Sequence, residues 1–174
     1  FDYSYKYFYR DGFGKDYRIL NLADDSDEEK RRLYLTACLL AFYQQQRLYR
    51  DKATEFRPFL LENPLWVFVG GSVNAVRSEN KRKVSDVVDI LLFLAEFVKE
   101  QRHTIKLLDR LLSGKPGLHD QRGNEIFATA FGYLSACKLN GEEAYRDIVK
   151  LLFNSPTPAA LHVENLKGPD GEIA

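Results

Sequence analysis

The chain has 174 residues, of which 45% are hydrophobic and 29% are charged. This length and balance indicate one globular domain, or two small ones at most, with enough apolar surface to fold without a disulfide or a metal. The 25 basic and 25 acidic residues cancel, which argues against a strongly basic domain that coats nucleic acid and against an acidic tail. No apolar run reaches membrane-spanning length and there is no secretory start, so we expect a cytoplasmic protein.

The sequence contains no methionine, not even at position 1. It starts on Phe1 inside a strand-like pattern, and we therefore expect an internal fragment of a longer protein. Cys38 and Cys137 lie far apart without metal-like spacing, and each sits in an apolar helical context. They are interpreted as reduced core thiols, as in a cytosolic protein.

Residues 1–22 are predicted to form a β-hairpin. Four tyrosines alternate with other residues at positions 3, 5, 7 and 9, which is the period of a strand, and a glycine-containing turn follows. Tyrosines on one face of a sheet would offer a stacking platform for bases. The alternative is a half-buried sheet face whose hydroxyl groups contact water.

A long helix is predicted from about residue 27 to about residue 51. Ser26 and Glu29 fit a capping box, and the middle of the helix is apolar nearly all round, which indicates burial on more than one side. Gln44, Gln45 and Gln46 follow. We interpret them as a solvated part of the helix rather than a functional cluster.

Residues 65–69 give the clearest strand signal in the chain. The run Leu-Trp-Val-Phe-Val is apolar, is preceded by Pro64 and is followed by two glycines. Such a run is typical of a central strand that is covered on both faces. The apolar stripes of residues 84–98 predict a helix packed on the same parallel sheet, so the expected fold class is α/β, rich in α-helix.

Three more helices are expected, over 103–113, near 124–139 and near 141–153. Asn124 is the candidate cap of the second, and Asn140 with Glu143 caps the third. A second β-hairpin is expected around 159–174, with its turn at Lys167–Gly171.

Gly70, Gly71 and Ser72 follow the predicted strand, at the edge where α/β sheets place ligands. Backbone amides of a glycine turn approach a phosphate closely, and the serine hydroxyl donates a hydrogen bond. The turn lacks the Gly-Lys-Ser/Thr of a Walker A loop and the pattern of a dinucleotide site. A ligand-free exit from the strand is the competing interpretation.

Lys81, Arg82 and Lys83, together with Arg77, form the most basic stretch. They suit contacts with a nucleic-acid backbone. A solvated basic loop explains them equally, because four charges on a neutral chain make a weak patch.

No metal site or catalytic centre is expected. His103, His119 and His162 are scattered and lack ligand spacing. The carboxylates that share a helix face are more typical of the solvent-exposed face of an amphipathic helix than of an acid–base catalytic pair.

Three stretches of the sequence resemble one protein family. Residues 37–49, 65–73 and 85–94 are similar to stretches of bacterial DEAD/DEAH-box helicases of the kind that includes the restriction (Res) subunit of type III restriction enzymes. The similarity runs along most of the chain. Its strings are distinctive but are not the catalytic motifs of the family.

The resemblance implies a part of an ATP-dependent DNA translocase built from two RecA-like lobes. Residues 1–60 would end the first lobe, 61–100 would begin the second, 101–158 would be a helical insertion and 159–174 a hairpin. ATP and Mg²⁺ would bind the parent protein outside this fragment, which holds no catalytic residue. DNA would contact Gly70, Gly71 and Ser72, and a methyltransferase subunit is a possible partner of the parent.

Two functions from different classes therefore stand. The first is the helicase fragment, which predicts a parallel sheet around residues 65–69. The second is a non-enzymatic α-helical module that binds a partner protein, which predicts a helical bundle with residues 65–69 at its periphery. A small independent enzyme is a third and weaker alternative.

Overall fold

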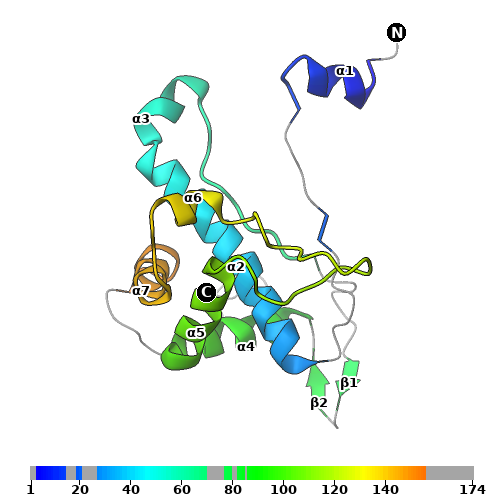
Figure 1. The fold of residues 1–174 in the computed structure, drawn as a ribbon, viewed down its shortest axis with the longest axis vertical. Coiled ribbons are helices and arrows are strands. Elements are labelled where there is room, and N and C mark those ends of the chain that lie inside the picture. The colour runs from blue at the N-terminus through cyan, green and yellow to red at the C-terminus, as the bar shows by residue number, and fades with distance from the viewer. Residues whose placement is uncertain are drawn as a thin grey trace, which may run out of the picture.

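The chain folds as an assembly of helices, with the elements arranged as in Figure 1. The computed structural model describes residues 3–14, 19–20, 27–69, 77–79, 82–84 and 86–155. In chain order, the elements are α1 (Tyr5–Arg10), α2 (Glu28–Asp51), α3 (Ala53–Phe56), η1 (Arg57–Phe59), β1 (Arg77–Glu79), β2 (Arg82–Val84), α4 (Asp86–Lys99), α5 (Gln101–Leu112), α6 (Gly132–Ala136) and α7 (Gly141–Leu152).

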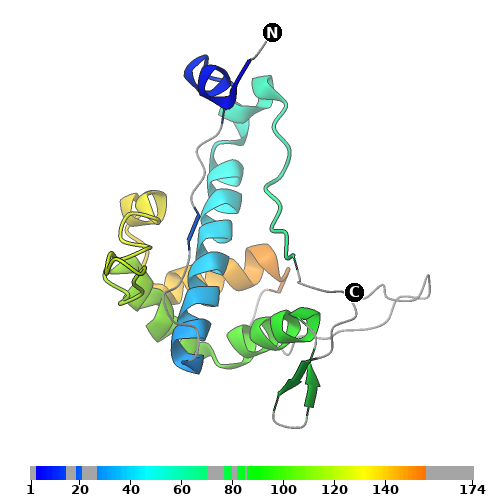
Figure 2. The same ribbon diagram turned by 90° about the vertical axis from the view of Figure 1, so that its right-hand side faces the viewer.

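Helix α2 is the axis of the fold. It runs for 24 residues, and the Asp27 carboxylate starts it by accepting hydrogen bonds from the backbone N–H groups of Glu29 and Lys30. This satisfies donors that have no partner inside the helix. Helices α4, α5 and α6 all pack against α2, and α7 packs against α5. Figure 2 shows α2 upright, with α4 and α5 beside its lower half and α3 at its upper end.

One hydrophobic core joins these helices. Tyr43 of α2 and Tyr145 of α7 are fully buried within it, and the Tyr145 hydroxyl donates to the Val98 carbonyl at 2.7 Å. That bond satisfies a carbonyl near the end of α4, where the helix runs out of partners. The other large side chains of the core are aliphatic or aromatic: Leu33, Leu39, Leu40, Phe97, Leu108, Leu111, Leu118, Phe127, Leu134 and Ile148.

The connection from α5 to α6 is a long, internally bonded loop. The Glu125 carboxylate accepts hydrogen bonds from the N–H groups of Gly117 and Leu118, and Asp120 accepts from those of Arg122 and Asn124. The predicted helix over 124–139 is therefore wrong for most of its length. Only α6, of five residues, forms, because acidic side chains hold the preceding backbone in turns.

The α/β prediction is wrong. Residues 65–69 form no strand, and the pairing of β1 with β2 is the one two-stranded sheet among the described residues. That pair is antiparallel, with Ser78 opposite Lys83. The run from Leu65 to Val69 has the composition of a buried strand. It has no neighbouring strand in the described chain, and an isolated strand leaves its backbone groups unpaired.

The N-terminal hairpin is also wrong in the part that is described. Residues 5–10 form α1, and the rings of Tyr5 and Tyr9 lie 6.0 Å apart, centre to centre, one helical turn from each other. The alternating tyrosines that suggest a strand thus belong in part to a short helix. Figure 1 shows α1 standing away from the other helices. The hairpin expected over 159–174 lies outside the described residues.

Four predicted helices are confirmed as α2, α4, α5 and α7. The capping box on α7 is confirmed too, with Asn140 accepting from the Glu143 N–H at 2.9 Å and Glu143 accepting from the Asn140 N–H at 3.1 Å. The cap of α2 differs from the prediction, because Asp27 fills that role and Ser26 lies outside the described residues. The division of the chain at residues 60, 100 and 158 stays a prediction.

Candidate functional site

The most distinctive surface is made by residues 60–69, which we call the return segment. Leu60 takes a left-handed backbone conformation with φ at 51° directly after η1. A left-handed residue reverses the chain direction after a helix. From there the segment runs back beside α2, as both ribbon views show (Figures 1 and 2).

One face of α2 holds the return segment in place. Phe42, Gln46 and Tyr49 share this face because they lie four and three residues apart. The Tyr49 hydroxyl donates to the Leu61 carbonyl at 2.9 Å, and the Gln46 amide donates to the Pro64 carbonyl at 2.6 Å. The return segment is therefore fixed to α2 through side chains of the helix.

Aromatic contacts continue this attachment beyond Pro64. The Trp66 ring lies 5.7 Å from the Phe42 ring and 4.3 Å from the Phe68 ring, measured between ring centres. Such pairs stabilise by roughly 0.5–1.5 kcal/mol beyond the apolar area that they bury. Trp66, which is part-buried, thus attaches this part of the segment to α2.

The odd-numbered side chains of the return segment face solvent. Leu65, Val67 and Val69 are exposed by 82%, 65% and 91%. Between them Trp66 is part-buried and Phe68 is 44% exposed. Exposure is therefore higher at the odd-numbered positions, as in a strand with one better-covered face. Three aliphatic side chains in a row on the open side form the kind of apolar surface that marks an interaction site.

The backbone of residues 65–69 has no hydrogen bond to any other described residue. The two carbonyls that α2 engages, of Leu61 and Pro64, precede this stretch. No charged residue occurs between Glu62 and Arg77. The stretch therefore lacks the charged side chains with which proteins protect an open strand edge.

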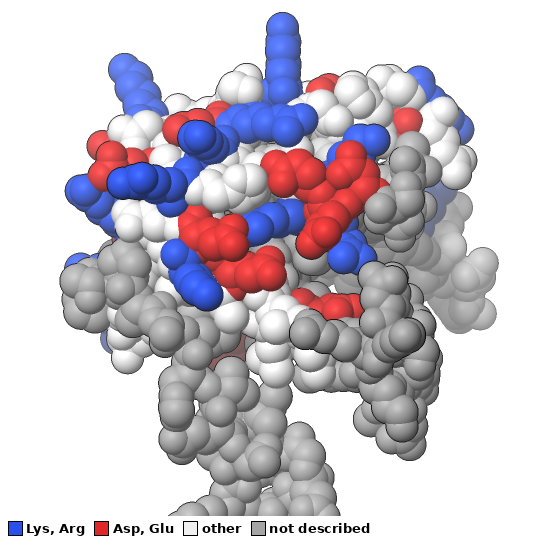
Figure 3. All heavy atoms as spheres, turned by 90° about the horizontal axis from the view of Figure 1, so that it is seen from below, with Lys and Arg blue, Asp and Glu red and all other residues white. Residues whose placement is uncertain are grey.

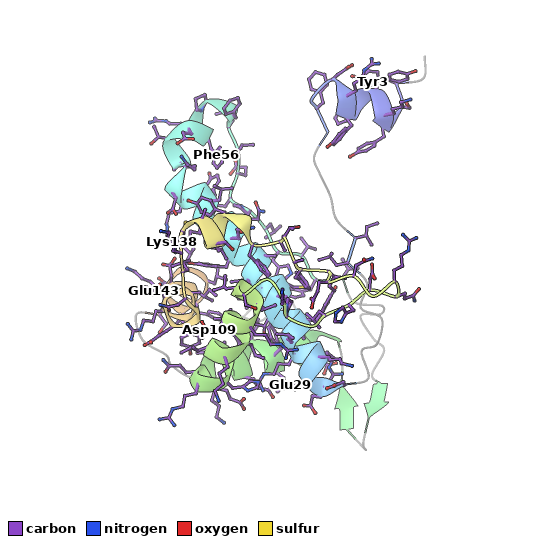
Figure 4. The ribbon with its side chains drawn as sticks, viewed as in Figure 1. Tyr3, Glu29, Phe56, Asp109, Lys138 and Glu143 are labelled. Carbon is purple, nitrogen blue, oxygen red and sulfur yellow. The ribbon has the colours of Figure 1, made fainter. Side chains whose placement is uncertain are left out.

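A hollow adjoins the turn at the start of the return segment. It has a volume of about 340 Å³, and its wall includes Tyr49, Phe56, Leu60 and Leu61. Phe56 lies on α3 at the upper end of the molecule (Figure 4). The Tyr49 and Phe56 rings stack there with their centres 6.2 Å apart. The apolar surface therefore continues from the segment onto the tip of α2.

A polar cluster joins α2 to α7. The Asp147 carboxylate accepts from the Tyr43 hydroxyl at 2.6 Å, from Arg47 at 3.3 Å and from both terminal nitrogens of Arg50 at 3.1 and 3.2 Å. Burial by itself would raise the pKa of Asp147, but the bonds from Arg50 and Tyr43 outweigh it and lower the pKa. The same burial and the bond to Asp147 raise the pKa of Tyr43.

A second carboxylate extends this cluster. Asp51 also accepts from Arg47 and Arg50, at 3.3 and 3.2 Å, and from the Tyr133 hydroxyl. Each arginine thus bridges two carboxylates. Such a network of charge-assisted hydrogen bonds stabilises the link between α2 and α7.

The glutamine run has a different role from the predicted one. Gln44 is buried and Gln45 is exposed, while Gln46 holds Pro64. The Gln44 side-chain oxygen accepts from the N–H groups of Tyr133 and Leu134, and its amide donates to the Ala130 carbonyl at 2.9 Å. Gln44 therefore caps α6 from a neighbouring helix, and the solvated-segment interpretation is wrong for it.

The structure describes only some of the residues that the sequence predicts to contact DNA. Gly70, Gly71, Ser72 and Lys81 lie outside the described residues. Arg82 and Lys83 belong to β2, with Arg82 paired opposite Glu79 across the hairpin. Their placement on a loop is thus corrected to a short strand, and DNA contact there stays a prediction.

The described surface gives no other candidate of comparable strength. Within the part of the chain that the structure describes, no three His, Cys, Asp or Glu side chains are grouped to hold a metal ion. Burial raises the pKa of the Cys38 thiol to about 11, against an opposing hydrogen bond from Tyr34, and this disfavours the thiolate, which is the reactive form. Basic and acidic side chains alternate on the face in Figure 3 rather than forming a one-sign patch.

Two sequence signals could have identified the return segment. The first is the helical spacing of Phe42, Gln46 and Tyr49, which places one apolar and two hydrogen-bonding side chains along a line. The second is the uncharged stretch after Glu62. Neither signal distinguishes a strand in a sheet from a strand-like segment lying on a helix.

Among the described residues, no helix is both long enough and apolar enough to cross a membrane. Comparison with known proteins gives no family, since no family model, no curated protein and no solved structure matches this chain.

Proposed function

We propose that this chain is a non-enzymatic α-helical module that binds a partner protein through the return segment. The observation that carries the proposal is the open apolar side of residues 65–69. Leu65, Val67 and Val69 face solvent on a segment that α2 fixes in place. A surface that is ordered before binding loses less conformational entropy when the partner docks.

The rest of the described chain supports a scaffold role. The core is continuous over five helices, and an arginine–aspartate network links α2 to α7. The hydroxyls of Tyr43 and Tyr145 are used in internal hydrogen bonds. The helices therefore serve to present the return segment rigidly, which is what an interaction module requires.

Site-specific photo-crosslinking tests the proposal. A photoreactive amino acid at Val67 is expected to give a discrete crosslinked product in cells, whereas the same group at exposed Arg146 on α7 is not. Adding Leu65→Glu is expected to remove the Val67 product, because a charge at that position opposes apolar contact. Equal products from both sites, or a product that persists with Leu65→Glu, would contradict the proposal.

A helicase part is the second candidate. In this candidate a longer parent protein would hold the ATP and Mg²⁺ sites and a surface for a methyltransferase. The family resemblance of residues 37–49, 65–73 and 85–94 supports the same proposal.

DNA-stimulated ATP hydrolysis by the intact parent tests this second candidate, with the present chain expected to be inactive alone. Changing Lys81, Arg82 and Lys83 to glutamate in the parent is expected to weaken DNA binding and reduce its salt dependence. Unchanged salt-sensitive affinity would remove the basic stretch from the proposal. A parent without ATP hydrolysis would remove the helicase candidate itself.

A further inference from the structure

We propose that the occupant of the return segment is a second copy of this chain, paired antiparallel through residues 65–69 about a two-fold axis at Val67. This inference rests on the proposed function, because it names the partner of the same surface. It adds the mode of recognition, which is backbone pairing between two identical edges.

The first argument is the unused hydrogen-bonding capacity. None of the N–H and C=O groups of residues 65–69 is bonded to another described residue. Exposed groups of this kind in a strand-like segment form a template for another chain. A copy of the same segment carries the complementary set of donors and acceptors by definition.

The second argument is self-complementarity of the side chains. With Val67 on the axis, Leu65 faces Val69 of the other copy, and Trp66 faces Phe68 of the other copy. The open side of each strand is then purely aliphatic, and the side toward α2 pairs aromatic rings. Aromatic and β-branched cross-strand pairs are the favourable combinations in antiparallel sheets.

The third argument is the absence of electrostatic opposition. The sequence has no charged residue from 63 to 76, so no like charges meet across the axis. The chain as a whole has a formal net charge of zero, which removes long-range repulsion between copies at neutral pH. Natural monomers commonly place lysine on an open edge to prevent this contact, and lysine is missing here.

The interface consists of one short strand pair and its neighbouring side chains, which is small, so the dimer is expected to be weak. Sedimentation equilibrium between about 10 μM and about 1 mM covers the range expected for small interfaces. The mean mass is expected to rise from that of one chain toward that of two. A single-chain mass at every concentration would overturn the inference and leave hetero-partner binding open, which separates its failure from failure of the proposed function.

Charge placed on the axis tests the location. Val67→Lys brings two like charges together and is expected to weaken the dimer at least tenfold. The matched control is Leu92→Lys, which changes an apolar residue of α4 that is also about half exposed. Equal weakening by both variants, or none by Val67→Lys, would overturn the inference.

Disulfide trapping tests the register. Opposed residues in an antiparallel pair have Cα atoms roughly 4.5–5.5 Å apart, within the range that a disulfide spans. With oxidised glutathione as oxidant, Val67→Cys is expected to give a covalent dimer, and Leu65→Cys alone is not. Trapping at Leu65 in place of Val67 would contradict the two-fold axis and with it the inference. The wild-type chain controls for Cys38 and Cys137.

Discussion

Replacing Gln44 by leucine measures how strongly one side chain of α2 holds α6. Gln44 makes three hydrogen bonds, accepting from Tyr133 and Leu134 and donating to Ala130. Leucine has a similar size and none of these groups. The substitution leaves two N–H donors and one carbonyl without their partner in a part-buried place.

The magnitude follows from these three losses. A buried backbone group without a partner costs about 1–3 kcal/mol, and the added apolar surface of leucine offsets part of the total. We expect the free energy of unfolding to fall by about 3 kcal/mol. For a chain of this length, that lowers the midpoint of thermal unfolding by about 6–12 °C.

The neighbouring glutamines provide matched controls on the same helix. Gln45→Leu changes an exposed side chain and is expected to alter stability by less than about 0.5 kcal/mol. Gln46→Leu removes only the bond to the Pro64 carbonyl. Its expected effect is about 1 kcal/mol or less.

Urea unfolding followed by far-ultraviolet circular dichroism gives the three free energies under one set of conditions. We expect the loss in free energy of unfolding to be largest for Gln44→Leu, smaller for Gln46→Leu and smallest for Gln45→Leu. If Gln44→Leu and Gln45→Leu were equally stable, the capping role of Gln44 would be refuted, and with it the account of why α6 forms where it does.

Three further changes are expected to have defined effects. Gly141→Ala would place a Cβ 2.5 Å from the Ile105 carbonyl oxygen and is expected to cost about 1–3 kcal/mol in urea unfolding. The pKa of Asp147 is lowered in the folded chain. Its contribution to the free energy of unfolding is therefore full above the unfolded pKa and is lost as the pH falls through the folded pKa. Asp147→Asn is expected to destabilise the chain at pH 7 and to do so progressively less below about pH 4. Phe42→Ala is expected to increase quenching of Trp66 fluorescence by acrylamide, since the ring contact is lost.

Each of these has an outcome that would contradict it. If the Gly141→Ala chain were as stable as the wild-type chain, α7 would have moved away from α5 without a loss of stability. A stability difference for Asp147→Asn that is constant from pH 3 to pH 7 would rule out a lowered pKa. Trp66 is the single tryptophan. Unchanged quenching after Phe42→Ala would therefore mean that the return segment does not pack against α2 through Trp66.

The sequence by itself determined the helices that carry their own signals. The capping box of Asn140 and Glu143 and the apolar stripes of α4 and α5 are local, and the structure has the helices where those patterns predict them. Periodicity and end signals fix an amphipathic helix because they act within a few residues of each other. The same locality explains why the buried middle of α2 was predicted correctly.

Tertiary structure decided what no local pattern distinguishes. Residues 65–69 have the composition of a central strand, yet a strand exists only if another strand lies beside it, and in the described chain the face of Phe42, Gln46 and Tyr49 takes that place. The fate of Gln44 likewise depends on residues about ninety positions away. Contacts with residues distant in sequence determine both outcomes, because a polar group or an apolar run is stable only in the surroundings that match it.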